Sequence, residues 1–335
     1  MPPGFRAARP VAAFAIAALA LLRPSATAAA DMTELKVGIS EPVNTVLALW
    51  MADAGGFYGA NGLKVEIINM SGGSRGAEAL QAGRIDVMHV GLSSVVRLNR
   101  AGADLRLVAS LSNVIRFTFF SGPGVKTAAD LKGGVVGVSS FGSESDATVT
   151  LALQRLGLTR DDVMLKEYGG GSRRLAALQA GEIKATAVNE PVASTARELG
   201  LNVMVDLAAE QIPWLFSGLV VKRSALEANR EKLVRFLKAA AEGNYLALSD
   251  DTQAKEVLAR ETKVTDAKVI AISYDDFRQQ SPKNLEPAHM GADNIIAQFP
   301  DSVSRNVDDY VDTSVLDGLN RDGFFAALAR KYDKH

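Results

Sequence analysis

Cysteine is missing from this sequence of 335 residues, so no disulfide can hold the fold together. The same absence excludes the lipid-modified cysteine that tethers many exported bacterial proteins to a membrane. The net charge of −1 at pH 7 argues against a nucleic-acid partner. After residue 30 the chain has no run of like charges, no proline-rich linker and no second apolar stretch of membrane-spanning length. These absences predict a chain that is globular from there onward.

Residues 1–30 carry the features of a secretory signal peptide. Arg6 and Arg9 precede an apolar run over 11–22, and small residues follow at 28–30. The run is about a dozen residues long, which is too short to cross a bilayer core that needs roughly twenty. We therefore expect cleavage near Ala30 and a freely soluble periplasmic protein that is not a lipoprotein.

The remaining chain, roughly three hundred residues, favours two domains on size alone and contains an internal repeat. Gly-Gly-Ser-Arg opens one copy at Gly72 and the other at Gly170, and Ala-Leu-Gln-Ala-Gly follows in both. Upstream, the segment Val37-Gly38-Ile39-Ser40 resembles Val136-Gly137-Val138-Ser139. The repeat predicts two lobes built on one plan.

Each copy alternates strands with helices, which is the pattern that produces a parallel sheet. Strands are expected at 35–39, 64–69 and 87–90 in the first copy and at 135–139, 164–168 and 185–188 in the second. Ser74 and Ser172 stand at the expected N-caps of two short helices, and Gly83 and Gly181 at their ends. In open parallel sheets the ligand site lies at the carboxyl ends of the strands. Two facing lobes therefore predict one cleft, walled by both sets of loops.

The chain has to cross between the lobes, and two extended apolar segments, 116–121 and 216–221, are the expected hinge strands. The later sequence is helix-rich and is assigned to the first lobe and its back face, with helices expected at 224–248, 252–261, 267–279, 291–299 and 315–332. The predicted organisation is a signal peptide over 1–30, a discontinuous first lobe over 31–117 and 218–335, and a second lobe over 118–217.

Several segments carry a pattern shared with a known family. They are Val37-Gly38-Ile39-Ser40, Gly83-Arg84-Ile85-Asp86-Val87, Asp130-Leu131-Lys132-Gly133, Leu178-Gln179-Ala180-Gly181-Glu182-Ile183 with Asn189-Glu190-Pro191, and Gly218-Leu219-Val220-Val221. Together they resemble the nitrate/sulfonate/taurine-type periplasmic substrate-binding proteins of ABC importers, a family that shares its fold with thiamin-pyrimidine synthesis proteins. The resemblance implies an α/β, two-lobed periplasmic binding protein fold of type II, with two parallel-type sheets, flanking helices and two hinge strands.

The resemblance also implies a function, that of an extracytoplasmic solute-binding protein rather than an enzyme. Such a protein would bind a small polar organic molecule, of sulfonate, amine, pyrimidine or aromatic acid type, and deliver it to a transmembrane permease with a cytoplasmic ATPase. No cofactor, nucleic acid or metal is expected, since His89, His289 and His335 do not stand in metal-ligand spacing. His89, on an apolar strand, is expected to be a buried histidine, and the protein is expected to be a monomer.

Twelve residues on the expected loops are candidate ligand contacts. They are Ser40, Glu41, Gly73, Ser74, Ser93, Ser140, Phe141, Gly142, Ser143, Asn189, Glu190 and Trp214. Loop-to-helix junctions offer free amides, and the hydroxyls over 139–145 suit an anion or a carbonyl. Asn189 and Ser93 can donate or accept hydrogen bonds. Phe141 and Trp214 could stack on a flat ligand.

Some of these candidates have an alternative structural role. Glu41 is equally a solvated turn carboxylate. Ser143 is also the expected N-cap of a helix, with Asp146 completing a capping-box-like pair. Phe141 is as readily a packing residue.

The expected carboxylates bear on the charge of the ligand. If Glu41 and Glu190 both face the cleft, a simple anion such as nitrate is disfavoured, because an uncompensated carboxylate beside it would repel it. Arg75, Arg116 and Arg173 could supply the compensating charge, although an arginine in the first turn of a helix is more often solvated.

Three other functions fit the sequence less well than solute binding does. Gly72-Gly73-Ser74-Arg75-Gly76 matches the nucleophile elbow of a secreted serine hydrolase. The second copy of the repeat keeps Gly170-Gly171-Ser172-Arg173 and then has Arg174, which favours a capped turn shared by both lobes. A triad would also need His89 or His289 on Ser74. The pyrimidine-synthesis relatives depend on cysteine-bearing motifs that are missing here, and regulators with this architecture need a helix-turn-helix where the leader stands.

Overall fold

The computed structural model describes Met1, Gly4 and residues 32–300 and 303–333. The chain divides into two units, Met1–Asp31 and Met32–His335, and all helices and strands of the described residues belong to the second. The predicted signal peptide lies almost wholly outside the described residues. No helix in the described part of the chain is long and apolar enough to span a bilayer.

The first lobe is built on a five-stranded sheet with the order β2-β1-β3-β10-β4. Its strands are β1 (Thr33–Ile39), β2 (Leu63–Asn69), β3 (Val87–Val90), β4 (Leu105–Val114) and β10 (Pro213–Lys222). β1 pairs in parallel with β2 and with β3, whereas β10 runs antiparallel to β3 and to β4.

The second lobe repeats this plan in the order β7-β6-β8-β5-β9. Its strands are β5 (Thr118–Ser121), β6 (Val135–Val138), β7 (Met164–Glu167), β8 (Ala185–Val188) and β9 (Asn202–Asp206). β6 is parallel to β7 and β8, and β5 is antiparallel to β8 and β9. The fourth strand in each order, β10 or β5, follows directly after the chain crosses from the other lobe and runs antiparallel to its neighbours. Both sheets are therefore mixed rather than parallel throughout. The predicted two-lobed α/β fold is confirmed.

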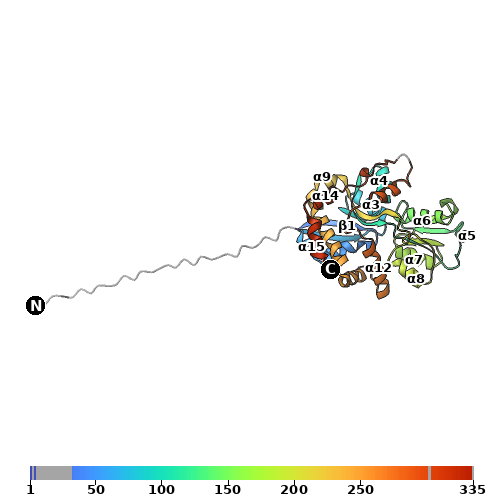
Figure 1. Ribbon diagram of the computed structural model, residues 1–335, viewed down its shortest axis with the longest axis horizontal. Coiled ribbons are helices and arrows are strands. Elements are labelled where there is room, and N and C mark those ends of the chain that lie inside the picture. Colours follow the sequence, from blue (N-terminus) through green and yellow to red (C-terminus); the bar gives the residue numbers. More distant parts are fainter. Residues whose placement is uncertain (2–3, 5–31, 301–302, 334–335) are drawn as a thin grey trace. The chain divides into compact units, whose positions relative to one another are not determined.

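Helices cover both sheets, and Figure 1 shows those of the second lobe gathered away from α9, α14 and α15. The second lobe has α5 (Ala128–Leu131), α6 (Glu144–Arg155), η2 (Arg160–Asp162), α7 (Gly171–Gln179) and α8 (Val192–Glu198). The first lobe has η1 (Asn44–Val46), α1 (Leu47–Ala54), α2 (Phe57–Ala60), α3 (Gly73–Gln81), α4 (Leu92–Arg100), α9 (Arg223–Ala228), α10 (Arg230–Ser249), α11 (Asp251–Thr262), α12 (Ala267–Gln280), α13 (His289–Ile296), η3 (Val307–Asp309), α14 (Ser314–Arg321) and α15 (Phe324–Tyr332).

Two helices that the sequence predicted as continuous are each divided in two. The helix expected over 224–248 breaks at Asn229, between α9 and α10, and the one expected over 315–332 breaks at Gly323, between α14 and α15. Gly323 has φ +76°, in the left-handed region that ends a helix and that glycine adopts without strain.

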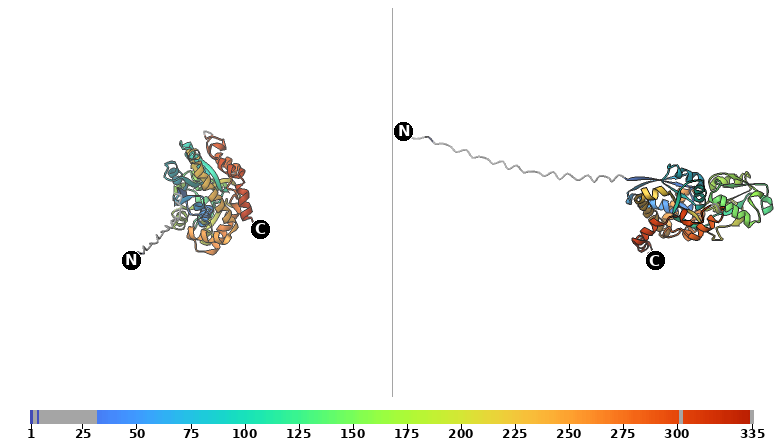
Figure 2. Two further views of the ribbon diagram at one scale, coloured as in Figure 1. Left: turned by 90° about the vertical axis from the view of Figure 1, so that its left-hand side faces the viewer. Right: turned by 90° about the horizontal axis from the view of Figure 1, so that it is seen from above.

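The chain crosses between the lobes over 115–117 and 207–212, and these two segments run side by side. Ile115 N donates to Ile212 O at 3.0 Å, and Ala208 N donates to Phe117 O at 3.0 Å. The predicted first hinge, 116–121, is correct only for 116–117, because 118–121 is β5 and pairs with β8 and β9. The predicted second hinge, 216–221, is wrong, because this segment lies inside β10 and pairs there with both β3 and β4. The second lobe, drawn in green, stands beside the first in the right-hand view of Figure 2.

The predicted helix caps are half correct. Gly83 and Gly181 both have φ +73° and follow the ends of α3 and α7, as expected. Ser74 and Ser172 are not N-caps, because each helix starts two residues earlier than predicted, and Gly72 or Gly170 holds the cap position without a capping side chain. The first amides of both helices therefore remain available to acceptors from elsewhere.

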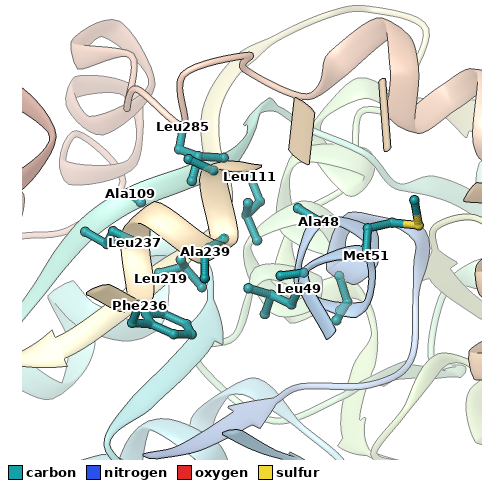
Figure 3. Packing of buried hydrophobic residues seen from close by; sticks show 14 of the residues in the cluster. Ala48, Leu49, Met51, Ala109, Leu111, Leu219, Phe236, Leu237, Ala239 and Leu285 are labelled. Atoms are coloured by element: carbon teal, nitrogen blue, oxygen red, sulfur yellow. The ribbon is translucent and has the colours of Figure 1, made fainter. Parts of the chain in front are cut away.

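The core of the first lobe forms where α1 and α10 cross over the sheet, and Figure 3 shows Leu49 of α1 and Phe236 of α10 packed toward Leu219 of β10. The two helices approach closely because Gly243 of α10 has no side chain. A Cβ at this position would stand 2.3 Å from the carbonyl oxygen of Ala48. Neither backbone can shift without moving its helix.

We expect Gly243→Ala to lower the free energy of unfolding by about 1–3 kcal/mol, the usual cost of overpacking a core. The measurement is urea unfolding followed by circular dichroism. Gly59→Ala is the matched control, since a Cβ at this helical glycine meets nothing within 4 Å. Equal stability of the two variants would contradict the close crossing of α1 and α10.

Candidate ligand-binding site

A cavity lies between the lobes, at the carboxyl ends of β1, β3, β6 and β8, where sheets of this kind place their ligand sites. Its volume is about 50 Å³, which is room for a few water molecules at most. The first lobe lines it with Ser40, Glu41, Val43, Thr45, Gly73, His89, Val90, Gly91, Phe216 and Ser217, the first crossing with Phe117, and the second lobe with Ser139, Ser143, Glu144, Ser145 and Asn189.

A glutamate from the second lobe reaches across the cleft. Glu144, at the start of α6, accepts hydrogen bonds from Ser93 N at 2.8 Å, Ser93 Oγ at 3.0 Å and Trp214 Nε1 at 2.7 Å. Burial outweighs these hydrogen bonds and raises the pKa of Glu144 to about 7. The carboxylate joins both lobes at the edge of the cavity.

A glutamate from the first lobe makes the reciprocal contact. Glu41, in the turn after β1, accepts a hydrogen bond from the amide of Gly171, the first residue of α7 in the second lobe. Two further hydrogen bonds cross the cleft: Ser74 Oγ donates to Phe141 O at 3.2 Å, and Asn44 N donates to Glu190 O at 3.4 Å. Polar contacts therefore hold the two walls of the cavity together.

A buried histidine forms part of the cavity wall in the first lobe. His89 Nε2 lies 3.1 Å from Ser217 Oγ and 3.3 Å from Thr45 Oγ1, and His89 Nδ1 is buried without a hydrogen-bond partner among the described residues. Burial lowers the pKa of His89 to about 4. At neutral pH the imidazole is uncharged and presents one donor and one acceptor.

The cavity wall is acidic. Its charged residues are Glu41 and Glu144, and neither lysine nor arginine lines it within residues 32–300 and 303–333. Arg75 and Arg173 are exposed on their helices. Arg116 is buried and paired with Asp276 outside the cavity, and burial lowers its pKa to about 10. The same described residues hold no cluster of three or more acidic or histidine side chains suited to a metal ion.

The structure places five of the twelve predicted residues on the cavity wall. They are Ser40, Glu41, Gly73, Ser143 and Asn189. Ser143 also caps α6, as predicted, by accepting a hydrogen bond from Asp146 N at 3.4 Å. Asn189 is 3 % exposed and lines the cavity, where its side-chain amide can both donate and accept a hydrogen bond.

Four of the other predicted residues serve contacts around the cavity. Ser93 and Trp214 bind Glu144, and Ser74 binds the carbonyl of Phe141. Glu190 is turned away from the cavity, where its carboxylate pairs with Arg197 at 2.9 Å and accepts a hydrogen bond from Ser194 N.

The last three predicted residues belong to the loop before α6. The Phe141 side chain is 48 % exposed, the Gly142 amide donates to Asp146 Oδ2 at 2.8 Å, and Ser140 Oγ is buried without a partner among the described residues. These three residues are not on the cavity wall.

Sequence reasoning missed Thr45, Phe117, Ser139, Glu144, Ser145, Phe216 and Ser217, and His89 was expected only as a buried residue. Glu144 and Ser145 belong to the segment 139–145 whose hydroxyls were expected to suit an anion or a carbonyl, but the sequence of this segment does not show that Glu144 contacts the other lobe. Ser217 and Phe216 carried no local signal, because β10 reaches the cavity only after the chain returns from the second lobe.

We expect the acid sensitivity of the protein to depend on His89. Its pKa is lower in the folded than in the unfolded chain, so the unfolded chain binds more protons between pH 6.5 and 4, and stability falls as the pH falls through this range. The loss approaches about 3 kcal/mol at pH 4. His89→Gln should lack this loss in urea unfolding at pH 7 and 4.5. His289→Gln, at an exposed site, should keep it; equal acid sensitivity in both variants would contradict the prediction.

Glu144 should act in the opposite direction. Its pKa is raised from 4.5 to about 7, so the folded chain binds more protons between these values, and the stability that Glu144 contributes below pH 4.5 is lost as the pH rises to 7 and above. The difference in unfolding free energy between wild type and Glu144→Gln should fall by up to about 3 kcal/mol over this range. Glu182→Gln, at an exposed residue, should show no such slope. A pH-independent difference for Glu144→Gln would refute a raised pKa.

A curated relative matches part of the chain. Riboflavin-binding protein RibY of Chloroflexus aurantiacus is 27% identical over 167 residues, which are 48% of this chain and 46% of RibY. The chain therefore spans less than half the length of that relative, and what RibY binds does not follow for this protein.

Solved structures and a protein family match most of the chain. A protein of Bordetella bronchiseptica RB50 superposes with a TM-score of 0.78 at 21% identity, covering 87% of this chain and 98% of that one. The periplasmic nitrate-binding protein NrtA of Synechocystis PCC 6803 gives 0.73 at 15% identity, over 87% and 89%. At these identities the likeness shows the fold alone. The NMT1/THI5-like family matches residues 44–254, well over half of the chain. This protein therefore belongs to the NMT1/THI5-like family and has the two-lobed fold of the periplasmic binding proteins.

Proposed function

We propose that this protein is the extracytoplasmic solute-binding component of an ABC importer, which captures a small polar organic molecule between its lobes and delivers it to a transmembrane permease. The observation that carries this proposal is the cavity at the carboxyl ends of four strands, walled by polar groups of both lobes. The signal-like residues 1–30 support export, and NrtA, which shares the fold, is a periplasmic protein.

Solute capture on this frame requires the lobes to separate. The cavity of about 50 Å³ is too small for an organic solute, since ligand pockets are usually several hundred cubic ångströms. The two crossings over 115–117 and 207–212 lie side by side and form a hinge about which the lobes can rotate. A solute that contacts both walls would shift the population toward the closed form.

The chemistry of the wall supports an uncharged or cationic solute with hydrogen-bond donors. Two carboxylates and an uncharged imidazole line the cavity. The buried guanidinium of Arg174 interacts with the charge of Glu41, whereas no lysine or arginine of the described residues lines the wall beside Glu144. Phe117 and Phe216 meet edge to face at 4.8 Å and offer an aromatic contact to a planar group. An amine or a pyrimidine-like heterocycle fits this wall better than a sulfonate or nitrate does.

A hydrolase is not favoured by the geometry. Ser74 Oγ donates to a backbone carbonyl, and no described histidine hydrogen bonds to it. Ser217 does contact His89, but the other ring nitrogen of His89 has no carboxylate to orient it, and a pKa of about 4 makes the imidazole a poor base at neutral pH. The desulfurization enzyme DszB shares the fold, with a TM-score of 0.62 at 19% identity, so the fold by itself does not decide between binding and catalysis.

A thermal-shift screen tests this function directly. Purified protein is heated with amines, pyrimidines, flavins, aromatic acids, sulfonates and nitrate, and a solute that binds only the folded state has to raise the melting temperature. We expect an uncharged or cationic member of the panel to raise the melting temperature. At a solute concentration one hundred times Kd, binding stabilises the folded state by about 2.7 kcal/mol. A shift with nitrate or sulfonates alone would overturn the proposed ligand class.

Asn189 is the residue to vary once a solute is found. We expect Asn189→Ala to weaken binding by about tenfold, since a hydrogen bond contributes about 1 kcal/mol or somewhat more. The measurement is isothermal titration calorimetry. Asn320→Ala, at an exposed position of α14, is the control and should bind as wild type does. Unchanged affinity in Asn189→Ala would remove this side chain from the site.

A further inference from the structure

Two helices that face the cleft begin without a capping side chain of their own. α4 starts after Gly91 in the first lobe and α7 starts after Gly170 in the second, and no side chain at either N-cap accepts a hydrogen bond. The first amides of a helix need acceptors from elsewhere, and the helix dipole makes a carboxylate the favoured one.

Each helix receives its acceptor from the opposite lobe. Glu144 of the second lobe accepts the amide of Ser93, the second residue of α4. Glu41 of the first lobe accepts the amide of Gly171, the first residue of α7. The two carboxylates are thus interlobe caps that point in opposite directions across the cleft, and both contacts can form only while the cleft is closed.

The contact made by Glu144 is the more completely built of the two. One carboxylate takes three donors of the first lobe, namely the amide and the hydroxyl of Ser93 and Trp214 Nε1. Trp214 is 1 % exposed, Ser93 2 % and Glu144 8 %. Gly91 completes the notch, because a Cβ there would stand 2.3 Å from Glu144 Cδ.

We propose that Glu144 is a positioning residue that latches the closed cleft, by filling a carboxylate-binding notch which the first lobe builds from Gly91, Ser93 and Trp214. The role of the latch in closing the cleft around a solute rests on the proposed function, whereas the contact itself does not. Because Glu144 fills the notch, the three donors are also withheld from any anionic solute. Glu144 therefore helps to set the specificity of the cleft as well as its closure.

The chain offers a built-in probe of this latch. It contains two tryptophans, so labelling the full chain with 5-fluorotryptophan gives two ¹⁹F resonances, which Trp214→Phe assigns. Trp214 donates to Glu144, and Trp50 lies buried in the core of the first lobe. The solvent isotope shift of each resonance between H₂O and D₂O measures its exposure, and small-angle scattering measures the separation of the lobes.

We expect Glu144→Ala to expose Trp214 and to increase the radius of gyration, while Trp50 remains shielded. Added formate should restore the shielding and the compact form by occupying the notch, whereas chloride at the same ionic strength should not. Asp130→Ala is the matched control, since Asp130 likewise accepts the amide and the hydroxyl of one residue, Thr127, but within the second lobe. It should leave both readouts as in wild type.

Wild-type shielding of Trp214 in Glu144→Ala would overturn the latch, and exposure that formate does not reverse would overturn the carboxylate notch. If Glu144→Ala does not fold, which loss of the shielded Trp50 resonance would reveal, Glu144→Gln carries the test. The glutamine side chain places an NH₂ group, itself a donor, against the donors of Ser93 and Trp214, so Trp214 should become partly exposed. Full shielding of Trp214 in Glu144→Gln would count against the latch. None of these readouts needs a solute, so a silent solute screen would leave their outcome standing.

Discussion

Free amides at the starts of helices are the constraint on which the cleft depends. A parallel β-α unit delivers the N-terminus of each helix to the carboxyl edge of its sheet, so the site where a solute can bind is also the site where backbone donors lack partners. Here Gly72, Gly91 and Gly170 hold N-cap positions and supply no acceptor of their own. Acceptors for α4 and α7 arrive from the facing lobe, which turns a local requirement of each helix into a contact that joins the lobes.

This arrangement explains why the cavity wall is acidic. A glutamate that caps the facing helix has its carboxylate at the interface, and two such residues, Glu41 and Glu144, supply the acidic groups of the wall. No lysine or arginine of the described residues lines the wall, although the buried Arg174 interacts with Glu41. Burial then works in opposite directions on the two kinds of titratable group. It raises the pKa of Glu144 and lowers that of His89, because it penalises the charged form of each. The cleft at neutral pH therefore holds an uncharged imidazole and a carboxyl group close to its titration midpoint.

The hinge follows from the order in which the strands are added. Each sheet contains one strand that follows directly after a crossing from the other lobe, β5 in the second lobe and β10 in the first. The two connecting segments have to pass between the same two sheets, and they hydrogen bond to each other there. Rotation about this pair would change the distance between the walls while leaving both sheets intact. Phe117 in the first crossing and Phe216 on β10 both line the cavity, and their rings meet edge to face.

The sequence by itself determined the repeat, the six strands of its two copies, the cleft at their carboxyl ends, and five residues of the cavity wall, because local periodicity and turn chemistry are written in neighbouring residues. Only the tertiary structure decided that 216–221 lies within a sheet rather than in a hinge, that Glu190 turns toward Arg197, and that Glu144 reaches Ser93 and Trp214. The two contacts of Glu144 join residues 51 and 70 positions apart. Glu190 and Arg197 are only seven positions apart, but the side on which they pair depends on how the lobe packs around them. The hydrogen-bond partners of Glu144 depend on where the first lobe positions Ser93 and Trp214. The local sequence around any of these three residues does not predict that they meet.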